Sequence, residues 1–449
     1  MKKKDGKQTS RGQAIACLVA WNGTGKPIQG FLDTLVYDSG LSHEDRQLAG
    51  MLVFGVLRRQ GYLDAIISRF AKTALRKMEP LTLFAFRVGV LQLCFLERIP
   101  AAAAVNETVA ALKTMHQPAW LLGFVNATLR AIAKEKASLT EPEAVGLLDH
   151  PVWLLERWRK HFGEETMREI CRINSLEPQL CLHSLRTGRE ELARLLAAQE
   201  IRSVAGQYAP ESLLLPDWRG AITSLPGFAN GLFQVQDQAA QLVCQLLGPF
   251  REQGRYLDGC AGLGGKTCAL AALLPAGAAL NAVEPDERRV RLLHENLKRQ
   301  KVQAQVSIFP GDLAAFAASK PLLFDGILID APCSGTGVIR RHPDIRWNRQ
   351  PGDFAALQAT QLSLLNTAAK LLAPGGVLVY ATCSLEPEEN QQVIEQFLSV
   401  HNDFRLKDCR DFLPASAVSL VDKQGFFLPL PAEEIEGFFA ARLERVGGE

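Results

Sequence analysis

The second half of the chain alternates short apolar runs with longer stretches of helical periodicity, and this alternation constrains the fold more than any other feature. Strands that alternate with helices form βαβ units around a mostly parallel sheet. Ligands of such sheets bind at the carboxyl ends of the strands. A helix is expected over residues 287–299. The expected strands cover residues 254–258, 279–283, 302–308, 324–329 and 377–380, with a last strand over 437–443 for which an antiparallel course is one option.

The first part of the chain predicts a different architecture. Apolar residues recur at helical spacing in residues 45–57 and 81–93. Pro80 favours the start of a helix, and Pro100 favours the end of one. Helical patterns with short polar breaks over residues 10–135 are typical of a compact all-α bundle.

A shorter segment of mixed pattern lies between these two regions. Residues 151–159 and 190–197 predict amphipathic helices, and residues 180–186 predict a strand, so we expect a small α+β piece here. The sequence therefore predicts three domains, which cover residues 1–140, 141–235 and 236–449.

Charge is distributed unevenly along the chain. The formal net charge is +2, but residues 1–140 hold 19 Lys and Arg against 10 Asp and Glu, a net charge of +9. Subtraction from the totals of 50 and 48 leaves 31 against 38, a net charge of −7, for the rest. A basic module favours a polyanionic partner. A solvated, lysine-rich helical surface explains the same counts, and composition does not decide between the two.

Composition disfavours several other classes of protein. No apolar stretch approaches the roughly 20 uncharged residues of a membrane helix, and residues 1–5 are not followed by an apolar signal core. The 10 cysteines form no CxxC pair, which disfavours metal ribbons and thioredoxin-type redox chemistry. We expect a cytoplasmic protein with reduced thiols, with no membrane or metal partner, and with a monomer as one option for its oligomeric state.

The first expected strand of the βαβ region runs into a glycine-rich loop. Glycines at 262, 264 and 265 let the backbone approach a ligand closely. The helix that follows from about Thr267 would present its free backbone amides to that ligand. A phosphate-binding P-loop with this spacing requires a glycine where the chain has Cys260, so nucleoside triphosphate binding is not predicted.

Acidic residues follow the next two strands. Glu284 lies about twenty residues after Gly264, which is the usual position of the ribose ligand in dinucleotide and adenosyl-cofactor folds. Asp312 lies in the turn after the third strand, where a side chain can reach an adenine edge. Singly, such an acid is more often a helix cap than a ligand. Their order at successive strand ends favours a cofactor that contains a nucleoside.

Two cysteines also follow expected strands. Cys333 lies in Asp330-Ala-Pro-Cys-Ser-Gly-Thr-Gly337, and Cys383 lies in Tyr380-Ala-Thr-Cys-Ser384. If their strands are neighbours, about 4.8 Å apart, both thiols reach one pocket beside the glycine loop. For this pair we favour covalent chemistry on a bound substrate.

The remaining cysteines are interpreted as small core hydrophobes, which free cysteines often are. This interpretation includes Cys260 and Cys268, which adjoin the glycine loop. A reactive thiolate requires nearby positive charge, because a free cysteine has a pKa of about 8.5. Lys266 and the run Arg340-Arg-His342 are candidates for that charge.

Together these motifs resemble those of the RNA cytosine-5 methyltransferases of the Sun family, which use S-adenosylmethionine. The basic bundle resembles a NusB-type RNA-binding domain, and with it the whole chain resembles the Sun/Fmu type, which acts on 16S ribosomal RNA. This resemblance implies an all-α NusB-like bundle, a small α+β linker domain and an α/β Rossmann-like methyltransferase domain. The motifs that carry it lie at 258–267, 283–286, 311–312, 330–337 and 381–384.

The resemblance also assigns roles to individual residues. It makes Cys383 the nucleophile that adds to carbon 6 of cytosine, gives Cys333 a part in product release, and turns Asp330 toward the base. The chain departs from the family at Gly262-Leu263, where Ala-Pro is usual, and at Glu284, where Asp is usual. The cofactor-binding residues that it implies are Cys260, Ala261, Gly262, Leu263, Gly264, Gly265, Lys266, Glu284, Asp312 and Asp330.

Substrate recognition leaves alternatives open. A base in a duplex cannot reach such a pocket, so the target cytosine must be unpaired or flipped out. Residues 342–347 mix basic and aromatic groups, which suits stacking and phosphate contact, but a surface loop with a buried tryptophan explains them equally well. Transfer RNA, 23S ribosomal RNA and a noncatalytic role as an RNA-binding assembly factor are the alternatives to methylation of 16S ribosomal RNA.

Overall fold

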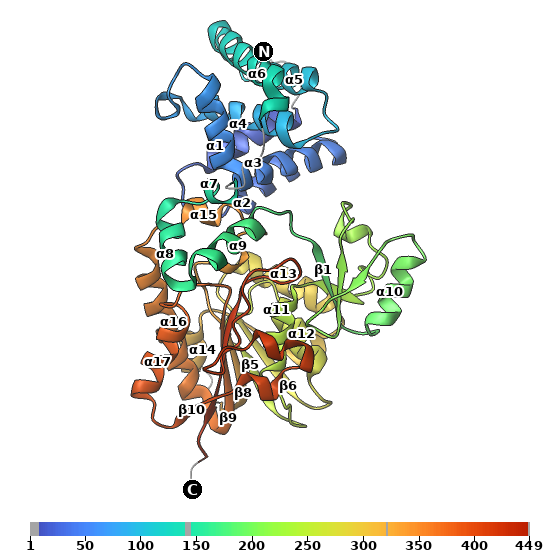
Figure 1. Cartoon of the computed structure of the whole chain (residues 1–449). Coiled ribbons are helices and arrows are strands. Elements are labelled where there is room, and N and C mark those ends of the chain that lie inside the picture. The colour runs from blue at the N-terminus through green and yellow to red at the C-terminus, as the bar shows by residue number, and fades with distance from the viewer. Residues whose placement is uncertain (1–8, 140–144, 320–321, 448–449) are drawn as a thin grey trace. The chain divides into compact units, whose positions relative to one another are not determined.

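The computed structural model describes residues 9–139, 145–319 and 322–447 (Figure 1). The chain divides into two compact units. The helical unit runs to Glu177 and also includes Ile339–Gln350. The sheet unit comprises Pro178–Val338 and the chain from Pro351 onward. The three domain boundaries predicted from the sequence stay a prediction.

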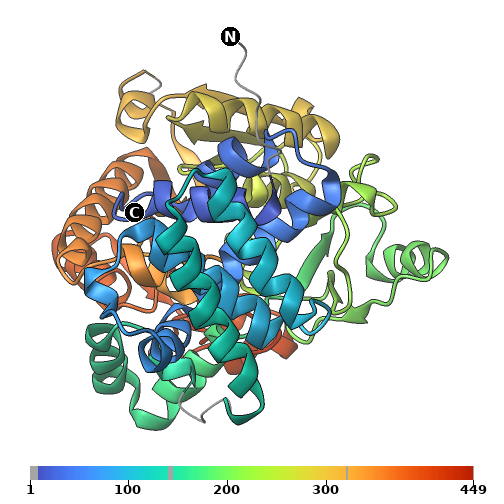
Figure 2. The same cartoon turned by 90° about the horizontal axis from the view of Figure 1, so that it is seen from above.

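The helical unit contains the predicted all-α bundle, in which α4, α5 and α6 pack side by side (Figure 2). Helix α4 begins at Pro80, as predicted. Pro100 does not end a helix, because α4 already ends at Phe95 and Pro100 instead directly precedes α5. The helices of this unit are α1 (Ser10–Trp21), α2 (Ile28–Leu32), α3 (His43–Phe70), α4 (Pro80–Phe95), α5 (Ala101–Thr114), α6 (Ala119–Glu135), α7 (Val145–Leu148), α8 (Val152–Phe162), α9 (Glu164–Asn174) and α15 (Ile345–Asn348).

Helix α3 is kinked at Arg59, whose φ of −116° and ψ of 16° are not helical. The backbone N–H of Tyr62 donates to the Asp149 carboxylate (3.0 Å) instead of continuing the helical ladder. In a continuous helix this N–H would bond the Arg58 carbonyl, which here accepts from Arg346 (3.4 Å), and the neighbouring Leu57 carbonyl accepts from the Trp347 indole (2.7 Å). The kink therefore arises where polar side chains insert into the ladder of backbone hydrogen bonds.

The segment that contains α15 is anchored in this unit by a buried arginine. Arg346 is fully buried and donates to the backbone carbonyls of Asn174 (2.9 Å) and Asp149 (3.0 Å). Trp347 is partly buried against the bundle core. The interpretation of residues 342–347 as a stacking and phosphate-contact loop is wrong for these two side chains, because both are engaged inside the helical unit.

The sheet unit is built on a seven-stranded sheet with the order β10-β11-β9-β8-β5-β6-β7. The five strands from β5 to β9 pair in parallel, and β11 pairs antiparallel with β9 and with β10. The strands are β5 (Arg255–Asp258), β6 (Ala279–Glu284), β7 (Val306–Pro310), β8 (Phe324–Asp330), β9 (Leu372–Thr382), β10 (Phe404–Lys407) and β11 (Phe439–Arg445). The predicted Rossmann-like α/β fold is thus confirmed.

Two details of the sheet differ from the prediction. The third parallel strand begins at Val306 rather than at 302, because residues 303–305 form a 3₁₀ turn after α13. The edge strand β10 is short and was not predicted, since Phe404–Lys407 alternates buried and exposed side chains over only four residues. The last strand is antiparallel.

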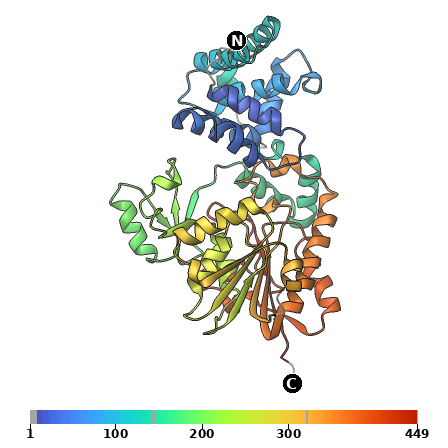
Figure 3. The same cartoon turned by 180° about the vertical axis from the view of Figure 1, so that it is seen from behind.

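Helices cover both faces of the sheet (Figures 1 and 3). Successive residues of β9 point to opposite faces, so Val379 packs with α11 and α12 whereas Tyr380 packs with α16 and α17. Burial on both faces explains why the central strands β8 and β9 contain continuous apolar runs. The helices of this unit, apart from α10, are α11 (Gln238–Gln245), α12 (Gly265–Leu273), α13 (Glu287–Arg299), α14 (Leu313–Ser319), α16 (Asp353–Leu371) and α17 (Gln391–Val400).

A small α+β piece precedes the large sheet in the chain, as predicted. Its four-stranded antiparallel sheet has the order β2-β3-β1-β4, and α10 (Arg189–Ala197) packs on it (Figure 3). The strands are β1 (Leu180–Ser184), β2 (Val204–Ala205), β3 (Ser212–Leu215) and β4 (Phe233–Val235).

Among the described residues, no helix is long and apolar enough to cross a membrane. Nor do these residues bring together three or more His, Cys, Asp or Glu side chains that could hold a metal ion.

Candidate active site

The order of the strands creates a crevice between β5 and β8. The chain runs from β5 outward to β6 and β7, and then returns to place β8 on the other side of β5. The loops after β5 and β8 therefore leave the same edge of the sheet in opposite directions, which is where doubly wound sheets bind ligands. The glycine loop follows β5, and the loop with Cys333 follows β8.

The glycine loop turns sharply before α12. Gly262 and Gly264 have φ values of +56° and +89°, in the left-handed region that favours glycine. The loop is tied to β6, because the Ala261 N–H donates to the Val283 carbonyl (2.9 Å). Leu263, which stands where the family usually has proline, is 51% exposed. Helix α12 then begins at Gly265, with its first amides at the crevice.

A pocket of about 290 Å³ lies beside this loop. Its lining includes seven of the ten residues predicted to bind the cofactor: Cys260, Ala261, Gly262, Leu263, Gly265, Lys266 and Asp330. Sequence reasoning missed three other lining residues, Gln236, Asp237 and Ala240. They come from the start of α11 and the residues before it, where no glycine or motif marks a ligand site.

Glu284 is nearly fully buried at the end of β6 and is bonded through both oxygens. Its Oε2 accepts from the Gly262 N–H and its Oε1 from the Asp286 N–H, each at 2.9 Å. The carboxylate thus holds the glycine loop. The extra methylene relative to aspartate does not prevent this contact.

Asp312 caps a helix. Its Oδ1 accepts from the Ala315 N–H (2.8 Å) in the first turn of α14. It follows β7 at the same edge of the sheet but is not among the residues that line the pocket. Its role at an adenine edge stays a prediction.

The structure brings the two motif cysteines together. Strands β8 and β9 are parallel neighbours with Asp330 opposite Ala381, and the Ala331 N–H donates to the Ala381 carbonyl (2.9 Å). Beyond this last rung of the ladder, the sulfur atoms of Cys333 and Cys383 lie 3.3 Å apart. Neither thiol is fully buried.

The two thiols lie in different electrostatic surroundings. The hydrogen bond to Cys383, and then burial and the negative charges of Glu389 and Asp330, raise the pKa of Cys333 well above its ordinary value. The raised pKa favours the protonated form of Cys333. Either sulfur atom can be the donor of the hydrogen bond between the two thiols.

Lys266 and Asp330 form an ion pair between the two loops, with Nζ and Oδ2 2.7 Å apart. Burial alone would lower the pKa of Lys266, but the charge and hydrogen bond of Asp330, together with the charge of ionised Cys383, raise it. Lys266 is thus the predicted positive charge that acts on Cys383. The other candidates, Arg340, Arg341 and His342, belong to the helical unit, where Arg340 is buried.

A buried carboxylate behind the cysteines was not predicted. Glu389 accepts from the Ser334 N–H (2.8 Å) and from the Ser384 hydroxyl (2.5 Å). In the sequence it follows Glu388, which is only partly buried, and nothing in the residue types separates the two. Only the folded loop shows which of them turns inward.

The other cysteines near the site fit the interpretation as packing residues. Burial raises the pKa of Cys244 and of Cys268 to about 12. Burial also raises the pKa of Cys260, whose thiol lies close to Asp258. All three thiols are therefore protonated at neutral pH.

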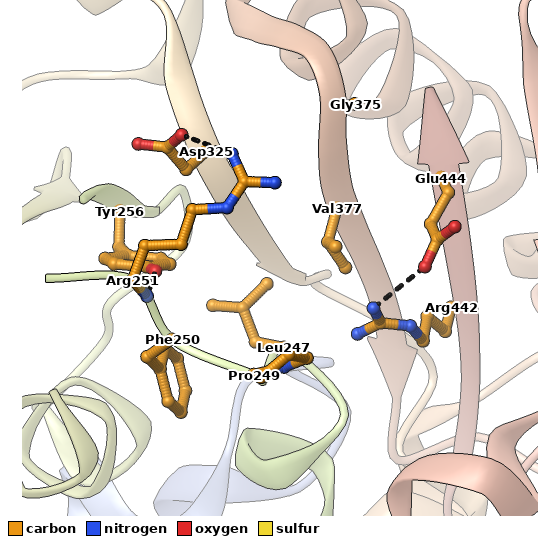
Figure 4. A pocket seen from close by; sticks show the side chains of 10 residues that line it. All are labelled: Leu247, Pro249, Phe250, Arg251, Tyr256, Asp325, Gly375, Val377, Arg442 and Glu444. Carbon is orange, nitrogen blue, oxygen red and sulfur yellow. Dashed lines mark hydrogen bonds and ion pairs between the residues drawn. The ribbon is translucent and has the colours of Figure 1, made fainter. Parts of the chain in front are cut away.

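A second pocket, of about 300 Å³, lies at the opposite edge of the sheet (Figure 4). Its arginines are paired, Arg251 with Asp325 (3.3 Å) and Arg442 with Glu444 (3.0 Å). No residue predicted to bind cofactor or substrate lines it. It lies at the amino ends of the parallel strands, away from the edge where such sheets bind ligands.

The fold and the site define a class of protein. A Rossmann-like sheet whose glycine loop is held by a carboxylate at the end of the next strand is the framework of an enzyme that binds a nucleoside-containing cofactor. Here a thiol pair is added at the neighbouring strand ends. The fold and the site therefore define an enzyme that holds its substrate beside a nucleoside-containing cofactor.

Comparison with known proteins supplies the family. The profile described as 16S rRNA methyltransferase RsmB/F matches residues 244–444, the NusB family matches 8–134, and the ferredoxin-like domain of RsmF/B-like methyltransferases matches 150–218. The chain belongs to the RsmB/F family of 16S rRNA methyltransferases. The predicted resemblance is confirmed.

Individual relatives cover nearly the whole chain. The probable ribosomal RNA small subunit methyltransferase B of Synechocystis sp. is 34% identical over 92% of this chain and 94% of its own. The ribosomal RNA small subunit methyltransferase B of Sodalis glossinidius is 37% identical over 90% of each chain.

Solved structures agree on the fold. A methyltransferase homolog protein from Pyrococcus horikoshii is 28% identical, with a TM-score of 0.57 over 69% of this chain and 100% of its own. NSun6 from Pyrococcus horikoshii, solved with SFG, is 21% identical, with a TM-score of 0.59 over 66% of this chain and 99% of its own.

The residues of this chain fit the cofactor of the class. The glycine turn leaves open space at Gly262 and Gly265, where an added Cβ would meet no atom within 4 Å. The first backbone amides of α12 lie at this turn, and the Glu284 carboxylate accepts a hydrogen bond from it through the Gly262 N–H. S-adenosyl-L-methionine is the cofactor.

Proposed function

We propose that this enzyme methylates carbon 5 of a cytosine in 16S ribosomal RNA through a covalent cysteine adduct. The observation that carries the proposal is the 3.3 Å separation of the Cys333 and Cys383 sulfur atoms at the ends of adjacent strands. Asp330 lies on the same loop as Cys333 and also lines the cofactor pocket. Relatives named as small subunit methyltransferases support 16S ribosomal RNA as the substrate.

Carbon 5 of cytosine is a poor nucleophile, so the chain must activate it. In the proposed reaction the Cys383 thiolate forms a bond to carbon 6, and the electron pair of the 5,6 double bond makes carbon 5 enamine-like. S-adenosylmethionine supplies the methyl group as an electrophile. A water molecule then takes the proton of carbon 5, the electron pair of that C–H bond restores the 5,6 double bond, and Cys383 leaves carbon 6 as a thiolate.

The two thiols are proposed to divide this work. Cys383 interacts with the positive charge of Lys266, and its sulfur atom lies 3.3 Å from that of Cys333. We assign the attack to Cys383, as the family resemblance does. Cys333, which keeps its proton, is assigned to the release step, where it assists departure of Cys383.

Asp330 is proposed to bind the base. One of its oxygens pairs with Lys266 at 2.7 Å, and its side chain is 31% exposed. A carboxyl group here can bond the Watson–Crick edge of a flipped-out cytosine. The cofactor residues predicted from the resemblance, including Gly264, Glu284 and Asp312, are retained in this proposal.

The helical unit is proposed to bind RNA. Residues 1–140 carry the net charge of +9, and their phosphate contacts would supply affinity without reading sequence. We retain the three-domain division at 140 and 235, a cytoplasmic location and a monomer as proposals. Transfer RNA and 23S ribosomal RNA are tested as alternative substrates.

Transfer of tritium from methyl-labelled cofactor tests the proposal. Unmodified 16S ribosomal RNA, 23S ribosomal RNA and transfer RNA are incubated separately with the enzyme, and the labelled base is mapped. Label on carbon 5 of one cytosine of 16S ribosomal RNA is expected. Label on another RNA would change the substrate, and label on another base or atom would overturn the proposed chemistry.

A further inference from the structure

Glu389 is a fully buried carboxylate that belongs to neither the cofactor pocket nor the thiol pair. It lies in the turn between β9 and α17. Its Oε1 accepts from the Ser334 N–H (2.8 Å) and from the Gln361 amide (3.0 Å). Its Oε2 accepts from the Ser384 hydroxyl (2.5 Å). A buried carboxylate requires such donors, and here three of them converge.

The donors connect the two cysteine loops. Ser334 directly follows Cys333, and Ser384 directly follows Cys383. The two serine hydroxyls also lie within hydrogen-bond distance of each other, at 3.0 Å. One carboxylate therefore holds the residue next to each thiol.

Two further hydrogen bonds, one from α16 and one from β9, stabilise the same loops. Gln361 of α16 also donates to the Pro332 carbonyl (3.0 Å), immediately before Cys333. The Tyr380 hydroxyl donates to the Glu389 backbone carbonyl (2.6 Å). The position of the carboxylate is thus itself fixed from two sides.

We propose that Glu389 is a positioning residue that sets the distance and mutual orientation of Cys333 and Cys383. This inference rests on the proposed function, since it concerns the same two thiols. Glu389 does not act on substrate. It acts through Ser334 and Ser384, which it contacts directly.

The alternative is that Glu389 only stabilises the fold and has no effect on the chemistry. The two roles differ in their consequences for the reaction. A merely structural carboxylate changes the free energy of unfolding and leaves the folded fraction with normal chemistry. A positioning carboxylate changes the rate of adduct formation in protein that is fully folded and binds cofactor normally.

Two substitutions separate the contacts. In Glu389→Gln the amide oxygen can still accept from Ser334 and Gln361, but the new NH₂ group faces the Ser384 hydroxyl. That hydroxyl must then turn its proton away, for example toward the Ser334 oxygen 3.0 Å distant. Glu389→Ala removes all three acceptor contacts. A graded loss is expected, smaller for the glutamine variant.

The matched control is Asp325→Asn at the opposite end of β8. Asp325 also accepts a backbone hydrogen bond, from the Arg255 N–H at 2.9 Å, and pairs with Arg251. Its substitution loses contacts of the same kind far from the thiols. It is expected to leave adduct formation unchanged.

The experiment measures adduct formation in the Cys333→Ala background, in which release of the product is blocked. Full-length protein and unmodified 16S ribosomal RNA are mixed with cofactor, and the covalent complex is followed in time. Glu389→Ala is expected to slow the adduct on the order of a hundredfold, the scale of a displacement of about 1 Å at a reacting group. The RNA concentration that half-saturates the rate of adduct formation and the cofactor affinity should stay unchanged.

The outcomes are distinct. If Glu389→Gln and Glu389→Ala form the adduct at the rate of the parent, the inference is overturned and Glu389 is structural. If Glu389→Ala does not fold, the rate of the folded Glu389→Gln variant decides the same question. If the Cys333→Ala parent itself forms no adduct, the proposed function fails, and the inference that rests on it falls too.

Discussion

Gly264 and Gly265 are neighbours in the cofactor loop, yet the structure predicts opposite effects when each is replaced by alanine. At Gly264 the backbone has φ +89°, and an added Cβ would lie 2.5 Å from Leu293 Cδ1. Leu293 is a fully buried core residue of α13, so it has little room to move. The left-handed conformation costs a non-glycine residue about 1–2 kcal/mol, and overpacking of a core costs about 1–3 kcal/mol more. Gly264→Ala should therefore lower the free energy of unfolding by about 2–5 kcal/mol.

At Gly265 an added Cβ meets no atom within 4 Å, and the residue is the first of α12. Alanine favours a helix by about 1 kcal/mol over glycine, so Gly265→Ala should leave the stability unchanged or slightly higher. The new methyl group faces the cofactor pocket that Gly265 lines. One misplaced carbon in a binding pocket costs roughly 1–3 kcal/mol, or about 10- to 200-fold in affinity.

Urea unfolding and calorimetric titration of S-adenosylmethionine into each folded variant separate the two effects. Gly264→Ala should lose stability, and Gly265→Ala should lose cofactor affinity while its stability holds. Equal losses of stability in both variants would refute the geometry assigned to this turn. Unchanged cofactor affinity in Gly265→Ala would refute the assignment of the pocket.

Three further predictions concern other parts of the molecule. Arg346→Met should destabilise the helical unit, since each buried carbonyl left without a partner costs about 1–3 kcal/mol. Arg69→Met is the control, because it removes only an exposed ion pair that contributes at most about 1 kcal/mol to stability. Equal urea midpoints for the two variants would contradict the prediction. Burial raises the pKa of Cys244 to about 12, so the folded protein holds this proton more tightly than the unfolded chain does. The resulting contribution to stability is present below about pH 8.5 and is lost as the pH rises toward 12. Between about pH 8.5 and 12 the free energy of unfolding should therefore fall less steeply with pH in Cys244→Ala than in the parent protein. Equal slopes in the two proteins would contradict this prediction. Lys266→Met should slow adduct formation by removing the charge beside Cys383, and Lys266→Arg should restore part of the rate; a normal rate in Lys266→Met would show that this charge is not needed.

The parallel core was predictable because burial on both faces leaves a direct trace in the sequence. Continuous apolar runs marked β8 and β9, and the loops at the carboxyl ends of β5, β6, β8 and β9 held the motif residues. The short edge strand β10 left no such trace, since four residues with partial exposure resemble any loop. The third strand was misplaced at its start because Val302 is apolar but precedes a 3₁₀ turn.

Residues of the candidate site could be selected from the sequence where one residue type indicates a chemistry. The roles proposed for Cys333, Cys383 and the glycine loop require groups that few other residues supply. Glu389 and Gln236 are common polar residue types, so only the fold distinguishes them from their neighbours. Residues 342–347 left two interpretations open, and the structure decides against an RNA-contacting surface for Arg346, which is buried in the helical unit.

The most direct test of the account is the covalent complex between Cys383 and the target cytosine. Cys333→Ala protein, Cys383→Ala protein and the double variant are each incubated with unmodified 16S ribosomal RNA and cofactor, and the products are separated under denaturing conditions. The account predicts a stable protein–RNA complex with Cys333→Ala, linked through Cys383, and none with the other two. A complex formed by Cys383→Ala alone would reverse the roles of the two thiols, and the absence of a complex from every variant would contradict covalent catalysis.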